Sequence, residues 1–141
     1  MTTTLKGSCL CGKVSAEANL SDQAMGACHC SMCRRWGGGP MLTIDGGTDV
    51  TFTGEDNISQ YNSSEWAKRG FCTHCGTHVY YLMTATGQYY MPAGFFDEAD
   101  SLHFSHQIFI DEKPTNYTFA NETHNMTGEE VFAAFSAGDQ E

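Results

Sequence analysis

Seven cysteines in a chain of 141 residues gather into three short clusters, and this grouping constrains the fold more than any other feature of the sequence. The clusters are CLC, CHCSMC and CTHC, which contain Cys9 and Cys11, then Cys28, Cys30 and Cys33, then Cys72 and Cys75. The odd count and the CxC spacing disfavour a disulfide framework, because cysteines one residue apart are too close for easy bridging. The clusters are instead typical of thiolate ligands to a metal ion.

The two outer pairs predict one closed zinc site. Short CxC and CxxC spacings let one tight turn aim two sulfurs at one ion, and Gly12 and Gly76 allow each turn to leave through a positive φ. Two such zinc knuckles supply four thiolates, so we expect a structural site formed by Cys9, Cys11, Cys72 and Cys75. This site would close a loop of about sixty residues and contribute directly to the free energy of folding.

The middle cluster supplies three thiolates and no fourth cysteine. Catalytic zinc typically has three protein ligands and one exchangeable position, so we expect a second, catalytic zinc on Cys28, Cys30 and Cys33. The alternative is a second closed site, completed by an acidic side chain or by one of the histidines His29, His74 and His78. Three thiolates make zinc a poor activator of water, and a soft thiolate suits its fourth position. The chemistry indicated is therefore activation or release of a substrate thiol.

The charge distribution disfavours one class of partner and indicates another. Seventeen acidic and seven basic side chains give a formal net charge of −10, so we expect no nucleic acid as a ligand. Most of the cations lie beside cysteines, where they offset thiolate charge or hold an anionic substrate. Arg34 and Arg35 are the first candidates for binding substrate carboxylates, because a guanidinium fork matches a carboxylate. Lys113 is the one cation far from any cysteine.

Short β-prone runs, separated by glycine, asparagine and aspartate turns, predict a mainly β fold of small antiparallel sheets. The runs are KVSAEA, MLTI, VTFT, ISQY, HVYYLM, QYYM, LHFSHQIFI and YTFA. We expect one helical turn at SMCRRW, after the middle cluster. We also expect a short C-terminal helix in GEEVFAAFSA, where Val131, Phe132 and Phe135 share a face.

Length and hydropathy predict a single domain over residues 1–141. Hydrophobic residues make up 40% of the chain, and no apolar run approaches the roughly 18 to 20 residues that cross a bilayer. The first residues, MTTTLKGSCLCGK, lack the apolar run of a signal peptide. We therefore expect a cytoplasmic protein without a membrane partner.

Four segments together resemble the family of glutathione-dependent formaldehyde-activating enzymes, namely GSCLCGKV, CHCSMCRR, KRGFCTHCGTHVYY and SHQIFIDEKPTNY. The resemblance covers about residues 7–117, and the tail after about residue 120 carries no motif that we can place. It implies a zinc-binding fold of several coiled antiparallel sheets. It also implies structural zinc on the four outer cysteines and catalytic zinc on the three middle ones, which agrees with the count of thiolates.

The activity implied is that of a zinc-dependent carbon–sulfur lyase, similar to S-(hydroxymethyl)glutathione synthase. Such an enzyme interconverts a glutathione-like thiol plus formaldehyde with the S-hydroxymethyl adduct. One alternative is an enzyme of the same family that acts on another thiol adduct or aldehyde, because the cysteine pattern does not encode the substrate pocket. The other is a non-enzymatic zinc module that binds proteins, which a closed second site without a pocket would favour.

Overall fold

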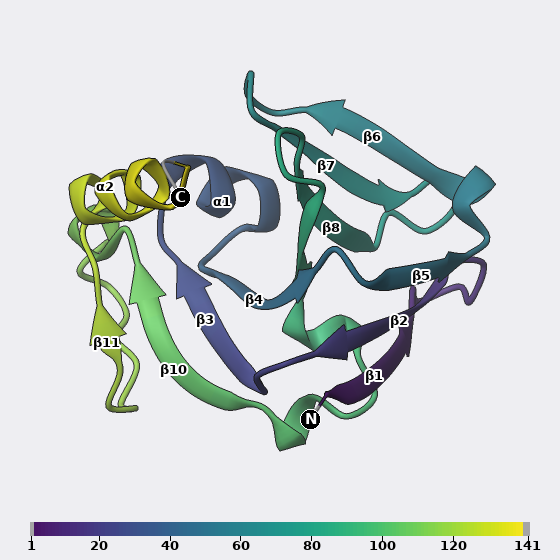
Figure 1. Cartoon of the computed structure of the whole chain (residues 1–141), viewed down its shortest axis with the longest axis horizontal. Helices are drawn as coiled ribbons and strands as arrows, with labels where there is room; N and C mark the ends of the chain where they lie inside the picture. The colour runs from purple at the N-terminus through teal and green to yellow at the C-terminus, as the bar shows by residue number, and fades with distance from the viewer. Residues whose placement is uncertain (1, 140–141) are drawn as a thin grey trace. The chain divides into compact units, whose positions relative to one another are not determined.

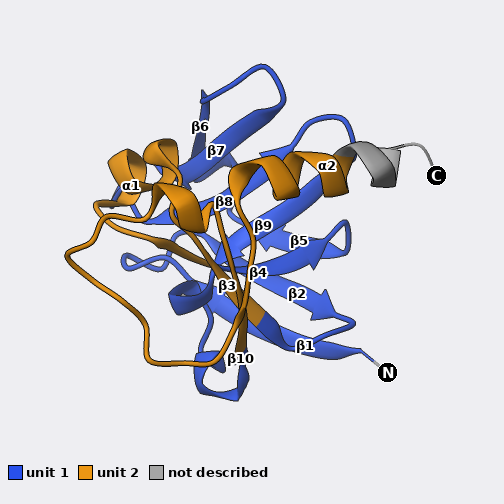
Figure 2. Ribbon diagram, turned by 90° about the vertical axis from the view of Figure 1, so that its left-hand side faces the viewer, with its two compact units in different colours: residues 1–24, 43–103 blue, residues 25–42, 104–141 orange. Residues whose placement is uncertain are grey.

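The computed structural model describes residues 2–139, and Figure 1 shows that strands dominate them. The described residues contain eleven strands, two α-helices and four short 3-10 helices, so the expected mainly β fold is confirmed. They divide into two compact units (Figure 2), unit 1 with residues 1–24 and 43–103 and unit 2 with residues 25–42 and 104–141. The single domain over residues 1–141 stays a prediction, and its residues 1, 140 and 141 lie outside the described part.

Unit 1 contains a three-stranded antiparallel sheet. Its strand order is β1-β2-β5, and the strands are β1 (Thr3–Ser8), β2 (Ser15–Leu20) and β5 (Val50–Thr53). Leu5 of β1 pairs with Ala18 of β2, and both side chains are fully buried. Side chains alternate between the two faces of a strand, so this register places one apolar face in the core.

A second run of paired antiparallel strands completes unit 1. The order is β4-β9-β8-β7-β6, with β4 (Met41–Gly47), β9 (Gln88–Pro92), β8 (His78–Met83), β7 (Ala67–Cys72) and β6 (Ile58–Asn62). Ile44, Val79 and Met91 are fully buried and form part of its core. Tyr80 packs its ring edge-on against Tyr89, with ring centroids 5.0 Å apart.

Unit 2 combines three short strands with both helices. The strand order is β11-β10-β3, with β3 (Ala24–Cys28), β10 (His103–Ile108) and β11 (His124–Asn125), and β10 and β11 pair in parallel. Helix α1 (Ser31–Gly37) follows β3 directly, and helix α2 (Gly128–Asp139) is near the C-terminus. Both helices begin where the sequence predicted them. Neither of these described helices is long and apolar enough to cross a bilayer.

One predicted strand is wrong, and four strands of the structure were not predicted. YTFA, residues 117–120, is irregular rather than a strand. Tyr117 and Phe119 pack around the His29 ring instead, with centroids at 5.6 and 6.1 Å, so the alternating aromatic residues serve a local cluster. Conversely, the predicted runs do not include β1, β3, β7 or β11. The strand β7 contains a charged residue, Arg69, in the interior. Arg69 is 2% exposed, and its guanidinium lies 4.9 Å from the centroid of the Tyr81 ring. The charged group is therefore buried in the protein interior.

Candidate metal centres and the adjoining pocket

The outer cysteine pairs stand on two tight turns of unit 1, one between β1 and β2 and one after β7. Each turn closes with a backbone hydrogen bond, in which Gly12 N donates to Cys9 O at 3.0 Å and Gly76 N donates to Cys72 O at 2.8 Å. The glycines have φ of 81° and 77°, which confirms the predicted exit through the left-handed region. Each turn therefore presents two thiols to the same site.

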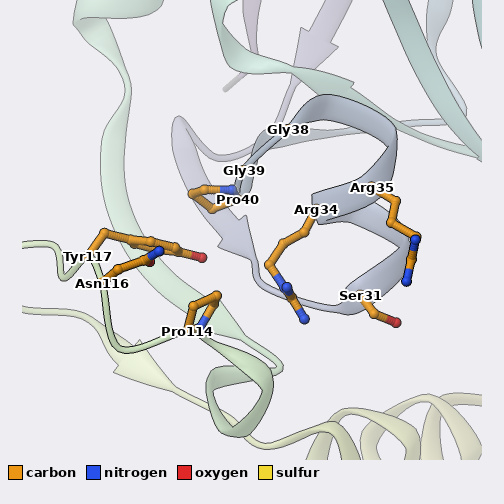
Figure 3. A pocket seen from close by; sticks show the side chains of 9 residues that line it. All are labelled: Ser31, Arg34, Arg35, Gly38, Gly39, Pro40, Pro114, Asn116 and Tyr117. Atoms are coloured by element: carbon orange, nitrogen blue, oxygen red, sulfur yellow. The ribbon is translucent and has the colours of Figure 1, made fainter.

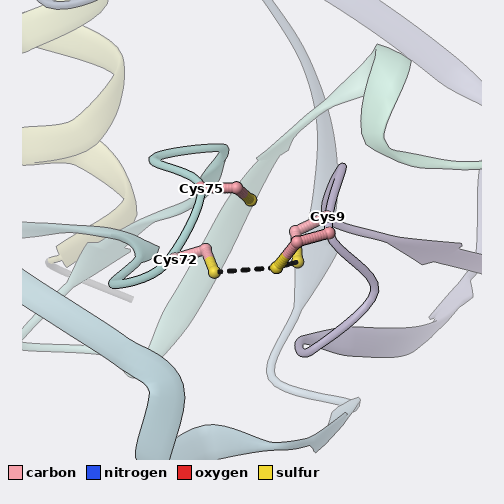
Figure 4. A group of neighbouring side chains, drawn as sticks. Cys9, Cys72 and Cys75 are labelled. Carbon is pink, nitrogen blue, oxygen red and sulfur yellow. Dashed lines mark hydrogen bonds between the residues drawn. The ribbon is translucent and has the colours of Figure 1, made fainter.

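These turns bring four thiols into one cluster. The sulfurs of Cys9, Cys11, Cys72 and Cys75 all lie within 4.8 Å of one another, and Figure 4 shows Cys9 facing the two cysteines of the other turn. The Sγ of Cys11 is 3.6 Å from that of Cys9 and 3.7 Å from that of Cys72. Sulfurs bound to one tetrahedral zinc at about 2.3 Å would be about 3.8 Å apart, so the four thiols fit such an ion.

Hydrogen bonds brace the two turns against each other. Leu10 N donates to Thr77 Oγ1 at 3.1 Å, and that oxygen lies 3.2 Å from the Sγ of Cys75. Hydrogen bonds from the Thr77 hydroxyl and backbone lower the pKa of Cys75 to about 5. At Cys11, a backbone hydrogen bond from Lys13 lowers the pKa, but burial and the other three thiols outweigh it and raise the pKa to about 11. Four thiolates cannot coexist here without a cation, and a divalent ion would remove their repulsion.

The middle cysteines form a second cluster, in unit 2. Cys28 ends β3, Cys30 is the N-cap of α1, and Cys33 lies in the first turn of that helix. Their three sulfurs lie within 4.8 Å of one another, and Cys33 N donates to the Sγ of Cys30 at 3.3 Å. Hydrogen bonds from the thiols of Cys28 and Cys33 lower the pKa of Cys30 to about 2. Hydrogen bonds to Cys30 and Cys33 raise the pKa of Cys28. The cluster thus already stabilises one thiolate.

No histidine or carboxylate joins this cluster among the described residues. His29, between two of the cysteines, is fully buried with both ring nitrogens engaged. Its Nδ1 lies 2.8 Å from Tyr117 Oη and its Nε2 lies 2.8 Å from Gln107 Oε1. His74 belongs to unit 1, where its Nε2 is 2.9 Å from Asn57 Oδ1. The described part of the chain therefore gives the closed-site alternative no fourth ligand.

Unit 2 has a cavity of about 490 Å³ (Figure 3), and some of its lining residues directly follow the middle cysteines in sequence. It is lined by Ser31, Arg34, Arg35, Gly38, Gly39, Pro40, Pro114, Asn116 and Tyr117. The two predicted arginines are thus brought to one pocket, and none of the described residues that line it is acidic. Arg34 Nε donates to the His29 carbonyl at 2.9 Å, whereas Arg35 is exposed. A pocket with this lining suits an anionic small molecule.

The opposite wall of the pocket comes from a loop that sequence reasoning did not assign to the site. It contributes Pro114, Asn116 and Tyr117, and its only sequence signal was the segment SHQIFIDEKPTNY in the family resemblance. Lys113 holds this loop: its Nζ donates to Pro114 O at 2.8 Å and also to Tyr117 O, and it lies 5.1 Å from the Tyr117 ring centroid. The cation far from every cysteine thus shapes the pocket wall.

Comparison with known proteins shows which family and which relatives the chain resembles. Residues 4–112 match the family described as glutathione-dependent formaldehyde-activating enzyme. The chain is 33% identical over 127 residues to a Schizosaccharomyces pombe protein named as an uncharacterized lyase, covering 89% of this chain and 93% of that one. A crystal structure of a Rhodobacter sphaeroides protein superposes with a TM-score of 0.57 at 26% identity, covering 65% of this chain and 87% of that chain.

Proposed function

The chain belongs to the family of glutathione-dependent formaldehyde-activating enzymes, and from this premise we propose that it is a zinc-dependent carbon–sulfur lyase. The proposed reaction interconverts a glutathione-like thiol plus formaldehyde with the S-hydroxymethyl adduct. One observation carries the proposal: a cluster of three thiols without a fourth ligand among the described residues is followed at once by residues of a cationic pocket. Ser31, which lines the pocket, is the neighbour of Cys30.

We assign two zinc ions per chain on the chemistry of the donors. Cys9, Cys11, Cys72 and Cys75 would hold the structural ion, and Cys28, Cys30 and Cys33 would hold the catalytic one. Sets made only of thiolates at this spacing favour zinc over hard cations such as magnesium or calcium. When bound to the middle cluster, zinc would supply a Lewis acid that keeps a substrate thiol deprotonated near pH 7.

The chain's own residues would bind and orient the substrate. Arg34 and Arg35 would hold substrate carboxylates, and the hydrogen bond from Arg34 Nε to the His29 carbonyl fixes the direction of that guanidinium. A cavity of about 490 Å³ is large enough for a small peptide-like thiol and confines it beside the cluster. We also propose a cytoplasmic location, because thiolate ligands need cysteines that stay reduced.

The test is exchange at equilibrium, because thiols and formaldehyde combine without a catalyst. Magnetisation-transfer NMR would compare the exchange rate between free and hydroxymethylated glutathione with and without zinc-loaded protein. We expect faster exchange with the wild type and the background rate with Cys30→Ser, because two thiolates hold zinc less well than three. Removing and restoring zinc in the wild type is the matched control, and it should abolish and then recover the exchange.

The outcome also separates the alternatives. A zinc-loaded wild type that leaves glutathione exchange at background, but accelerates exchange of another thiol or aldehyde, has a different substrate within the same family. A protein that accelerates none of them and still binds zinc at both clusters would overturn the proposed reaction and favour a zinc-binding interaction module.

A further inference from the structure

The pocket of unit 2 has two walls that come from segments far apart in the chain. One wall is α1, with Ser31, Arg34 and Arg35, and the other is the loop after β10, with Pro114, Asn116 and Tyr117. Figure 3 shows these two groups on opposite sides of the pocket. A ligand that touches both walls is held in one geometry only if the walls keep a fixed separation.

A hydrogen bond between Ser31 and Glu112 ties the two walls together. The backbone N of Ser31 donates to Oε1 of Glu112 at 3.1 Å, across 81 residues of sequence. Ser31 is the first residue of α1 and lines the pocket. Glu112 ends the 3-10 helix η4 (Ile110–Glu112), two residues before Pro114. Glu112 therefore links the start of the helical wall to the start of the loop wall.

The turn that carries Glu112 is held on its other side by α2. Gly128 N donates to Asp111 Oδ1 at 2.9 Å. Phe109, which precedes the turn, has a φ of 53°, a value that a bulky residue keeps only where its surroundings hold it. Its ring packs edge-on against that of Phe132, with the centroids 5.7 Å apart. With Asp111 bonded to α2 and Glu112 bonded to α1, the turn is a fixed support for the loop.

Beyond Glu112 the loop is held by contacts of its own. Lys113 Nζ donates to Pro114 O at 2.8 Å and also to Tyr117 O. The Tyr117 ring stacks on the His29 ring, with the centroids 5.6 Å apart. These contacts keep residues 113–117 compact and anchor the far end of the loop, so the position of the Pro114 end depends on Glu112.

A helix cap is the simplest role for such a carboxylate, but α1 already has one. The Sγ of Cys30 caps the helix by accepting from Cys33 N at 3.3 Å. Glu112 is bonded to the residue next to Cys30, so its negative charge opposes both the thiolates of the middle cluster and an anionic ligand. A carboxyl group accepts from Ser31 N whether it is ionised or protonated, so the link does not depend on titration. The favourable contribution of the side chain is therefore the connection between the two walls.

We propose that Glu112 is a positioning residue that fixes the separation of the two walls. Without its hydrogen bond, the Pro114 end of the loop would sample other positions, and a ligand would bind only the fraction of molecules with the wall in place. The affinity would fall for ligands that touch both walls and not for ligands that touch α1 alone. For the anionic thiols of the proposed function, on which this inference rests, Glu112 thus favours long, peptide-like thiols over short ones.

The experiment compares two anionic thiols of different length. Glutathione can reach from the arginines to the loop, whereas mercaptoacetate carries only a thiol and one carboxylate. Calorimetry measures both affinities at constant zinc content. Glu112→Ala should weaken glutathione binding roughly three- to tenfold, the range for one hydrogen bond, and leave mercaptoacetate within about twofold of the wild type. A general loss of stability would instead weaken both probes equally, and that result would overturn the proposal.

Two further variants are the controls. Glu112→Gln keeps a carbonyl acceptor for Ser31 N without the charge, so it should retain the wild-type ratio of the two affinities. Glu122→Ala removes an exposed acidic group of the same unit and should retain this ratio as well. If Glu112→Gln behaves like Glu112→Ala, the effect comes from the charge and the proposal is overturned.

Another measurement needs no variant, so it decides even if Glu112→Ala fails to fold. The Ser31 amide of the zinc-loaded wild type should exchange with solvent more slowly than its intrinsic rate, and exchange at the intrinsic rate would overturn the proposal. The expected affinities without catalysed exchange of formaldehyde would overturn the reaction and leave the role of Glu112 standing. Catalysed exchange with an unchanged affinity ratio in Glu112→Ala would do the reverse, and binding of neither probe by the wild type would overturn both.

Discussion

Arg34 and Arg35 are adjacent in sequence, but their surroundings differ. Arg34 is partly buried and donates through Nε to the His29 carbonyl, whereas Arg35 is exposed. Arg34→Ala should therefore weaken binding of an acidic thiol by about 1.5 to 3 kcal/mol, or roughly tenfold or more, as for a charged hydrogen bond. Arg35→Ala should cost less than about 1 kcal/mol, because solvent screens exposed charges. Calorimetry at constant zinc content measures both, and equal losses would contradict the distinction.

Gly76 tests the turn that presents Cys75. Its φ is 77°, and a Cβ added there would meet no atom within 4 Å, so Gly76→Ala introduces backbone strain without a clash. We expect a loss of about 1 to 2 kcal/mol in the free energy of unfolding. Gly94→Ala is the matched control, because its Cβ also meets nothing within 4 Å and its φ lies outside the left-handed region. Chemical denaturation of the zinc-loaded proteins would show the difference, and equal stability of the two variants would refute the strain.

Individual residues could be assigned from the sequence where their role depends on neighbours in the chain. Gly12 and Gly76 were predicted as turn exits because they follow their cysteines directly, and the structure gives both a positive φ. Tyr117 could not be assigned, because its partner His29 is 88 residues away and only the fold brings them together. The wall of the pocket thus depends on tertiary contacts that no spacing rule describes.

Helix α2 begins with a reciprocal pair of hydrogen bonds that makes its stability depend on pH. Thr127 N donates to Glu130 Oε1 at 3.0 Å, and Glu130 N donates to Thr127 Oγ1 at 3.2 Å. The bonds from the Thr127 backbone and hydroxyl lower the pKa of Glu130 below its ordinary value of 4.5. A lowered folded-state pKa stabilises the helix above the unfolded-state pKa, and this contribution is lost as pH falls through the folded-state value.

Amide exchange in α2 should therefore accelerate as the pH is lowered below about 4.5, relative to the intrinsic rate. Glu130→Gln keeps an acceptor for Thr127 N but cannot titrate, so it should remove this pH dependence. Glu129→Gln, one residue earlier on the same helix, is the control and should retain it. An unchanged profile in Glu130→Gln would show that the capping carboxylate is not the source.

Elements were predictable where one local pattern determines them. Helix α1 follows a cysteine that caps it, and α2 follows Thr127, so both starts are encoded within a few residues. The failures came from side chains whose environment is tertiary. In β7, Arg69 is buried, although a charged side chain is usually exposed. At residues 117–120 the aromatic residues alternate as in a strand, but they pack around His29 instead.

For the whole molecule, the two metal clusters should differ in what their loss does. The four-cysteine cluster joins segments 61 residues apart, and cross-linking a loop of that length removes about 4 kcal/mol of chain entropy from the unfolded state. The three-cysteine cluster spans only six residues in sequence and closes no long loop. We therefore expect two zinc ions by elemental analysis, one released readily by a chelator and one retained until the chain unfolds.

Cysteine variants turn this difference into a test of cooperativity. Cys72→Ser should unfold the strands of unit 1, whereas Cys33→Ser should lose the second zinc and leave the fold largely intact. The chain passes between the two units three times, so neither unit is a continuous segment. If the chain is the single domain that we propose, Cys72→Ser should abolish the structure of unit 2 in the same transition, followed by amide signals from α1 and β10. Persistence of those signals after unit 1 has unfolded would identify two independent domains, and full folding of Cys72→Ser without metal would refute the structural role of the four-cysteine site.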